Sequence, residues 1–316
     1  MYKNYSFMQE YKCLLIPDWL GSARKNGVEL GPACLNQAIL SSDKKINNKL
    51  LIDYFSRDSI AVQVPDSPQL NHTQGLYEKN KYLPEIKEVC NSAKKGILKI
   101  IDGKKHPIVL MGDDSSLIGV LSGISERHTN NFGLVYFDAH GDINTPQTTL
   151  SGCIFGMPLS YLLNIDNLSK FFNNKNYLHG ENITMMGARN FDEGEKEFIN
   201  KLKFCFYSPD KINETDSEKL CGEILSYYSK KNIDKLFMHI DVDVLDPSES
   251  KGTLLCEPNG IKAEKIYEII SILAKSSVNL GISISEYNPI LDENNSTLSI
   301  AVNILHKYIE NSCYNQ

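Results

Sequence analysis

Short, uninterrupted apolar runs alternate with longer mixed segments along most of the chain. Within each run the apolar residues are mostly continuous rather than alternating, which is typical of parallel strands that are buried on both faces. We therefore predict a strand in each run. The runs include YKCLLIPD (11–18), SIAVQVPD (59–66), HPIVLMGDD (106–114), FGLVYFDAH (132–140), NITMMGARN (182–190), KFCFYSPD (203–210), DKLFMHIDVD (234–243) and VNLGISISE (278–286).

Segments between the runs carry apolar residues at spacings of three and four, which predicts amphipathic helices. The clearest are residues 83–101, 217–231 and 263–276. Alternation of strands and helices predicts an α/β fold with three αβα layers and a doubly wound, mostly parallel sheet. The chain shows no internal repeat and no long linker, so we expect residues 1–316 to form a single domain. The Asn- and Lys-rich stretch 164–182 is then a surface excursion within that domain.

Several of the runs end in carboxylates, and in four of them no proline separates the acids from the apolar residues; one of these four also has a histidine between two of its acids. Ligands bind outside the carboxyl ends of the strands in open α/β sheets, and residues two apart on a strand share a face. If these strands are neighbours, we expect their terminal side chains to converge in one crevice. The terminal residues are Asp113 and Asp114, then Asp138, His140 and Asp142, then Asp241 and Asp243, and finally Glu286.

A gathering of carboxylates needs compensation, because like charges at close range raise each other's pKa or bind cations. Oxygen-rich sites with a single nitrogen suit Mn²⁺ or Mg²⁺, and bridging carboxylates indicate two metals that activate a shared water. The alternative is that each acid caps the helix or turn after its strand. Capping explains single acids, Asp114 and Asp246 best of all, but it does not explain two D-x-(D/H) pairs on separate strands.

Composition narrows the possible partners and compartment. The formal net charge of −6 argues against nucleic acid, because phosphate binding needs a basic face. No apolar run approaches the roughly 20 residues of a membrane span. The N-terminus MYKNYSFMQEYK lacks the apolar stretch of a secretory signal, so we expect a cytoplasmic protein. The eight cysteines are scattered without a C-x-x-C pair, which favours free thiols over a zinc site or disulfides.

Blocks in the sequence resemble those of the ureohydrolases, the family that holds arginases, agmatinases and formiminoglutamases. They extend over nearly the whole chain, and DINTPQTTLSG (142–152) is most similar to arginase sequences. The resemblance implies an arginase-like fold, a homo-oligomer (trimer or hexamer) and two Mn²⁺ per chain, with a single ion as the alternative. The blocks are GVELGP (27–32), MGDDSS (111–116), DAHGDIN (138–144), SGCIFGMP (151–158), GARNFDEGE (187–195), IDVDVLDP (240–247) and SEYNP (285–289).

The resemblance also implies roles for single residues. Asp138 and Asp241 would bridge the metals, His140 and Asp243 would complete one shell, and Asp142 would ligate the other metal and hydrogen-bond its hydroxide. That hydroxide would attack the guanidinium carbon of arginine, giving ornithine and urea. The implied metal ligands are Asp114, Asp138, His140, Asp142, Asp241 and Asp243, and the implied catalytic residues are Asp142 and Glu286.

The substrate residues follow from the same resemblance. Glu286 would hold the guanidinium, a task that suits a carboxylate because it can accept two parallel hydrogen bonds. Asn144 and Ser151 match residues that read the α-carboxylate of arginine, and Asp192 matches one that reads its α-amino group. The expected ligand is therefore a small guanidino substrate or an arginine-containing peptide.

Three positions depart from the family pattern. Asp114 stands where the Gly-Gly-Asp-His-Ser block has its metal-binding histidine, Cys153 replaces an asparagine near the substrate carboxylate, and Phe155 replaces a proton-shuttling histidine. Asp114 still offers oxygen to a metal, but its charge is expected to raise the pKa of the bound water. A thiol nucleophile at Cys153 is an alternative without a visible histidine partner. His239 is expected to face away from Asp241 as a satisfied core histidine.

Two functions remain open. The first is a Mn²⁺-dependent hydrolase of a guanidino group, with arginine, free or within a peptide, as the substrate. Five of the six ligand positions of the family and Glu286 favour this hydrolase. The second is a protein of the same fold that has lost catalysis and serves as a binding or scaffold subunit. Asp114 and Phe155 favour the second, because Phe155 cannot transfer a proton.

Overall fold

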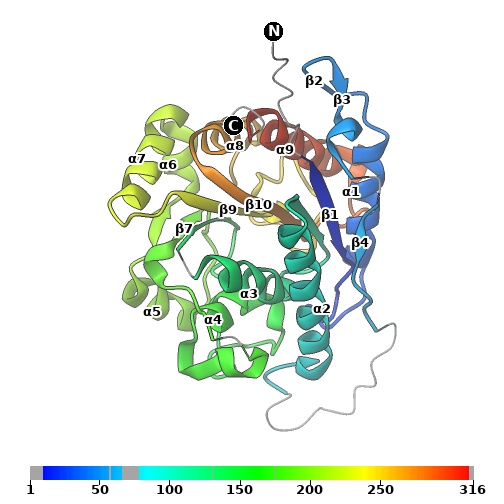
Figure 1. Ribbon diagram of the computed structural model, residues 1–316. Coiled ribbons are helices and arrows are strands. Elements are labelled where there is room, and N and C mark those ends of the chain that lie inside the picture. The colour runs from blue at the N-terminus through cyan, green and yellow to red at the C-terminus, as the bar shows by residue number, and fades with distance from the viewer. Residues whose placement is uncertain (1–9, 57, 66–77, 130, 174, 313–316) are drawn as a thin grey trace.

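An eight-stranded parallel sheet runs through the centre of the computed structural model, which describes residues 10–56, 58–65, 78–129, 131–173 and 175–312 (Figure 1). The strand order is β4-β1-β5-β10-β9-β6-β7-β8, and every neighbouring pair is parallel. The strands are β1 (Tyr11–Ile16), β4 (Ile60–Ala61), β5 (His106–Met111), β6 (Gly133–Phe137), β7 (Ile183–Met186), β8 (Cys205–Tyr207), β9 (Lys235–Asp241) and β10 (Val278–Ser285).

Each predicted apolar run contains one of these strands, so the strand prediction is confirmed. The runs are continuous because the sheet is buried on both faces. In β5, Ile108 and Leu110 belong to the core on one face, whereas Val109 and Met111 belong to the core on the other. A strand between two cores needs apolar residues at every position, which explains why the runs do not alternate.

Helices cover both faces of the sheet and produce the predicted three-layer αβα architecture (Figure 1). The three predicted helices correspond to α2 (Leu83–Asp102), α7 (Ser217–Ser229) and α8 (Ala263–Ser276). One face is covered by α2 (Leu83–Asp102), α3 (Leu117–His128), α4 (Pro158–Leu162) and α5 (Glu193–Leu202). The other face is covered by α1 (Gly31–Leu40), α6 (Pro209–Glu214), α7 (Ser217–Ser229), α8 (Ala263–Ser276) and α9 (Ser296–Ser312).

Smaller features complete the fold. The strands β2 (Lys45–Ile46) and β3 (Lys49–Leu50) form a separate antiparallel pair. The stretch 164–182 is not a simple surface excursion, because Leu168 and Phe172 are buried and Phe172 packs edge-on against Tyr161. Within the described ranges, none of the helices combines the length and the apolar character that a membrane crossing requires. The described cysteines are free thiols, and Cys313 lies outside the described residues.

The four acid-ended strands are the four central neighbours β5, β10, β9 and β6, so their carboxyl ends share one edge of the sheet. Gly112 carries the chain from β5 into the short helix η4 (Asp114–Ser116). A Cβ atom at Gly112 would lie 1.9 Å from the Asp18 carbonyl oxygen, so only glycine fits there. The Glu286 N–H donates to the Gly112 carbonyl over 2.7 Å, which fixes the end of β10 beside the end of β5.

Candidate metal centre

Two groups of potential metal ligands form at this shared edge. Asp138, His140 and Asp243 offer ligand atoms that lie within 4.8 Å of one another, and so do Asp114, Asp138 and Asp241. Asp138 belongs to both groups, which suits a carboxylate that bridges two neighbouring ions. The structure therefore brings together five of the six predicted metal ligands. The sixth, Asp142, lines a cavity that Asp114, His140, Asp241 and Asp243 also line.

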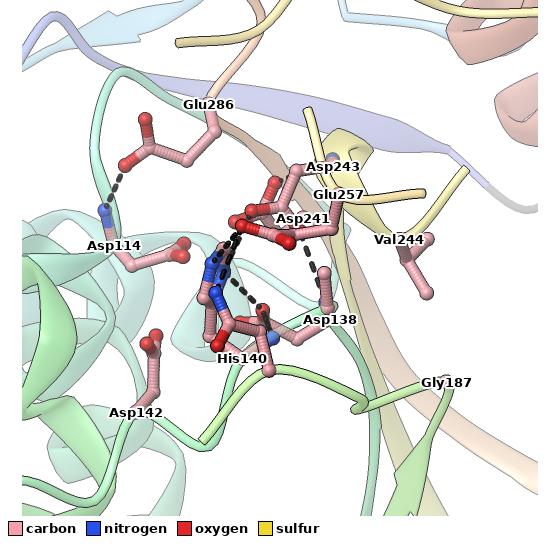
Figure 2. A network of polar contacts seen from close by, with 12 residues as sticks. Asp114, Asp138, His140, Asp142, Gly187, Asp241, Asp243, Val244, Glu257 and Glu286 are labelled. Carbon is pink, nitrogen blue, oxygen red and sulfur yellow. Dashed lines mark hydrogen bonds and ion pairs between the residues drawn. The ribbon is translucent and has the colours of Figure 1, made fainter. Parts of the chain in front are cut away.

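His140 has a carboxylate near each ring nitrogen, as Figure 2 shows. Its Nδ1 lies 2.9 Å from Asp243 Oδ2 and 3.5 Å from Asp138 Oδ1, and its Nε2 lies 3.5 Å from Glu257 Oε1. Metal-binding histidines commonly pair their second nitrogen with a carboxylate, which fixes the tautomer and the ring orientation. Glu257 is placed for that task, and sequence reasoning missed it because no motif surrounds it.

Asp142 and Glu286 both adopt left-handed backbone conformations, with φ of 50° and 59°. Residues other than glycine rarely adopt this conformation, and such strain concentrates at functional sites. The Tyr136 hydroxyl donates to Asp142 Oδ2 over 2.7 Å. The backbone N–H of Asp114 donates to Glu286 Oε1 over 3.3 Å (Figure 2). These contacts orient both carboxylates toward the cavity.

Capping of a helix or turn explains the positions of some of the acids, but it does not explain the clustering of the potential metal ligands. Asp246 Oδ1 accepts from the Ser248 N–H over 3.0 Å, and Asp113 Oδ1 accepts from the Ser115 N–H at the start of η4. Asp138 and Asp241 also accept from backbone N–H groups two residues on, but each keeps its second oxygen for another partner. Capping and metal binding are therefore compatible at these two positions.

Burial dominates the electrostatics of the centre. Burial, followed by the charge of Asp243, raises the pKa of Asp138 to about 6. Burial and neighbouring carboxylates hold the pKa values of Asp142, Asp241 and Glu286 well above the ordinary carboxyl range. Burial opposes the charged form of His140, but Asp138 and Asp243 outweigh it and raise the His140 pKa to about 12. Protein groups alone leave this cluster under-compensated.

The donor atoms fit divalent cations such as Mn²⁺. Within the described residues, Asp114 Oδ1 and Asp138 Oδ2 are buried and make no hydrogen bond. Buried polar atoms almost always have partners, and an ion between these oxygens would supply one. A set of carboxylate oxygens with few nitrogens matches the preference of Mn²⁺ and Mg²⁺ rather than that of softer metals.

A cavity of about 220 Å³ opens above the acids and contains the predicted substrate residues. Glu286 is 4% exposed and lies at its base. Asn144 donates to Asp192 Oδ2 over 2.9 Å and accepts from the Thr148 hydroxyl over 2.9 Å, so its amide is engaged at both ends. Ser151 also lines the cavity, where its hydroxyl oxygen accepts from the Cys153 N–H over 3.2 Å.

Both substituted positions near the substrate line this cavity as well. The Cys153 thiol points to the Ser22 carbonyl oxygen at 3.6 Å, so the contact that the structure gives it is a main-chain carbonyl rather than a base. Phe155 presents a ring that neither accepts nor donates a proton. The lining also includes Glu195, whose pKa burial raises to about 7.

Arg189 is a second residue that sequence reasoning missed. Its guanidinium donates to five main-chain carbonyl oxygens, those of Gly187, Asp243, Val244, Glu257 and Pro258. These carbonyls belong to the ends of β7 and β9 and to the loop that carries Glu257. Arg189 thus ties three separate segments around His140, and its position in the GARNFDEGE block was the available signal.

The expectation that His239 faces away from Asp241 is wrong. The two residues are two apart in β9 and therefore share a face of the strand. His239 is fully buried, as expected of a core histidine, but its Nε2 lies 3.2 Å from Asp114 Oδ1 at the edge of the centre. Its spacing from Asp241 was the signal that would have shown this.

Comparisons with known proteins agree with this geometry. The profile of the Arginase family matches residues 14–310. An arginase of Staphylococcus aureus (strain MSSA476) is 32% identical over 283 residues, which cover 89% of this chain and 91% of that protein. The arginase of Bacillus subtilis (strain 168) is 32% identical over 297 residues, covering 93% and 95%.

A solved structure agrees as well. That of arginase from Bacillus caldovelox superposes with a TM-score of 0.85 at 27% identity and covers 96% of this chain and 98% of that one. With the family profile matched over most of its length and the acidic centre at the shared strand edge, the chain belongs to the arginase family.

Proposed function

We propose that the protein is a Mn²⁺-dependent hydrolase of a guanidino group, acting on arginine, free or within a peptide, to give ornithine and urea. The observation that carries the proposal is the position of Glu286. This buried carboxylate lines the same cavity as members of both groups of potential metal ligands, Asp114 and Asp241 of one and His140 and Asp243 of the other. A protein that used the metals only for stability would not need an acid there that can clamp a cation.

Two bound Mn²⁺ ions would supply an activated water and polarise the scissile group. The residues that would hold them are Asp114, Asp138, His140, Asp142, Asp241 and Asp243.

The protein's own residues provide binding and orientation. Glu286 binds the guanidinium through two parallel hydrogen bonds, and the Asp114 N–H keeps its Oε1 in place. Asp142 is held through Oδ2 by Tyr136, which leaves Oδ1 to accept a proton or a cation. Burial of these carboxylates excludes water and strengthens their interaction with a cationic substrate.

Fewer side chains are available to bind the α-carboxylate end of an arginine substrate. Asn144 is engaged by Asp192 and Thr148, and the Cys153 thiol turns to a main-chain carbonyl. Both positions match family residues near the α-carboxylate of arginine. Weak recognition of an α-carboxylate at these positions would suit a peptide-bound arginine, because its carboxylate is part of a peptide bond. Peptide-bound arginine is therefore proposed as a substrate alongside free arginine.

A binding protein without turnover is the second candidate, and Phe155 is the observation that favours it. General acid–base catalysis contributes about 10²- to 10⁴-fold to a rate, and Phe155 removes one group that could provide it. In this case the cavity would still take up Mn²⁺ and a guanidinium, but it would release no urea.

The test is to load the protein with Mn²⁺ and measure urea from arginine, from arginine peptides with blocked carboxyl ends and from agmatine. Urea from arginine or a peptide, formed with a kcat/KM about 100-fold lower in Glu286→Gln, supports the hydrolase. The matched control is Glu197→Gln, which changes an exposed glutamate of α5 outside the cavity and should leave turnover unchanged. Two bound Mn²⁺ without urea from any compound would support the binding protein instead.

A further inference from the structure

His239 lies at the edge of the centre in a fixed orientation. Its ring stacks on Tyr136 with the centroids 4.7 Å apart and the planes at 26°. Its Nδ1 lies 2.8 Å from the Ser283 hydroxyl, on the neighbouring strand β10. With one face and one nitrogen held, the second nitrogen, Nε2, is directed toward Asp114 Oδ1 at 3.2 Å.

This contact does not satisfy either atom. Within the part of the chain that the structure describes, His239 Nε2 and Asp114 Oδ1 are both buried and neither makes a hydrogen bond, although they lie 3.2 Å apart. Asp138 Oδ2, in the same cluster, is also without a hydrogen bond. An ordinary core histidine has both ring nitrogens satisfied, whereas Nε2 of His239 lacks a hydrogen-bond partner among the described residues.

The 3.2 Å separation is the one expected for two ligands of a single ion. Adjacent ligands of an octahedral cation with bonds of about 2.1 Å lie about 3 Å apart. Asp114 itself groups with Asp138 and Asp241, and His239 reaches this group from the Asp114 side. When Nδ1–H donates to the Ser283 hydroxyl oxygen, Nε2 keeps its lone pair for a metal, the usual arrangement for a metal-binding histidine.

The position of the His239 imidazole also bears on the replacement of a histidine by Asp114. The ureohydrolase pattern has a histidine there, and this chain has Asp114 in its place. We propose that His239 supplies the nitrogen ligand to the cation held by Asp114, Asp138 and Asp241, so that the lost imidazole is replaced from β9, which lies beyond β10 from the strand β5 that leads to Asp114. The proposal rests on the metal dependence of the proposed function and extends it by one ligand. The competing arrangement is a hydrogen bond from Nε2–H to Asp114, without metal contact.

The first experiment counts nitrogen ligands in the unaltered protein. The protein is labelled with ¹⁵N-histidine and loaded with Mn²⁺, and the hyperfine couplings of the bound ions are measured by pulsed electron paramagnetic resonance. Two classes of coordinated imidazole, from His140 and His239, are expected. A single class with two Mn²⁺ bound would overturn the proposal while leaving the proposed function intact, and no bound Mn²⁺ would overturn both.

The second experiment uses variants with Mn²⁺ titrations as the readout. His239→Gln is expected to weaken one of the two Mn²⁺ sites at least about 100-fold and to remove one imidazole class, since lost outer contacts alone cost about 10- to 100-fold. The control His306→Gln removes an imidazole from α9 and should change neither. Unchanged Mn²⁺ affinity in a folded His239→Gln protein would overturn the proposal.

A rescue variant separates a ligand role from a packing role. Asp114→His combined with His239→Ala returns the imidazole to the position that the family pattern gives it. The double variant is expected to bind the weakened Mn²⁺ at least about tenfold more tightly than His239→Ala alone. A double variant no better than the single one would show that His239 contributes packing instead of a nitrogen ligand.

Discussion

The raised pKa of Asp138 makes a quantitative prediction about the metal-free protein. Its pKa is about 6 in the folded protein against an ordinary value of 3.8. The difference of about 2, at about 1.4 kcal/mol for each unit, corresponds to about 3 kcal/mol in the free energy of unfolding. Asp138 is 1% exposed, so solvent screening reduces this value little.

The sign follows from proton binding. The folded metal-free protein holds the Asp138 proton more tightly than the unfolded chain does. The stabilisation is therefore complete below pH 3.8 and is lost as the pH rises through about 6. Asn resembles the protonated carboxyl and still offers Oδ1 to the His140 N–H. Metal-free Asp138→Asn is thus expected to match the wild type near pH 4 and to exceed it by about 3 kcal/mol above pH 6.

Bound Mn²⁺ should reverse this order, because the ion would compensate the ionised Asp138, and the variant lacks the carboxylate that both groups of potential ligands share. The assay is urea unfolding of both proteins between pH 4 and 8, with chelator and with saturating Mn²⁺. Asp246→Asn is the control, since the hydrogen bond to Ser248 lowers the pKa of that turn carboxyl and no reversal is expected. Parallel stability curves for wild type and Asp138→Asn in chelator would refute the reasoning.

Three further predictions concern single side chains around the centre. Phe155→His places a proton-transfer group in the cavity and should raise the turnover number about 10- to 100-fold in a urea assay, as expected of general acid–base catalysis. An unchanged rate would mean that another group already transfers the proton. Glu286→Gln removes the charge that binds the guanidinium and should lower kcat/KM about 100-fold, since a charged hydrogen bond contributes about 1.5–3 kcal/mol; the protein should still bind two Mn²⁺ by titration. Arg189→Leu leaves five main-chain carbonyls without their donor and should reduce the free energy of unfolding by about 2–5 kcal/mol. The control Lys196→Leu removes a cation at an exposed position and should change the free energy of unfolding by less than about 0.5 kcal/mol.

Much of the fold could be predicted from the sequence because its cause is local. A strand between two cores must be apolar at every position, as Ile108 and Val109 of β5 illustrate. The candidate ligands were predictable for a related reason, since Asp138 and Asp241 follow buried strands, at the edge where open α/β sheets bind ligands. Resemblance to the ureohydrolase blocks added their separate roles.

Strand order was beyond the sequence pattern. The converging acids depended on β10 and β9 lying between β5 and β6, although these pairs are far apart along the chain. Periodicity fixes the face on which a side chain lies, but the neighbour of a strand is decided by packing between distant segments. Arg189 and Glu257 were missed for that reason, because their partners lie on three separate segments.

His239 and Asp114 show where the division falls. The sequence by itself determined that position 114 carries a carboxylate instead of an imidazole, and that His239 precedes Asp241 by two residues on a buried strand. Only the tertiary structure decided that the two side chains meet, with Nε2 and Oδ1 3.2 Å apart. The physical reason is that β5 and β9 both pair with β10. A side chain of β9 can therefore reach the residue that follows β5, although the two strands are not neighbours.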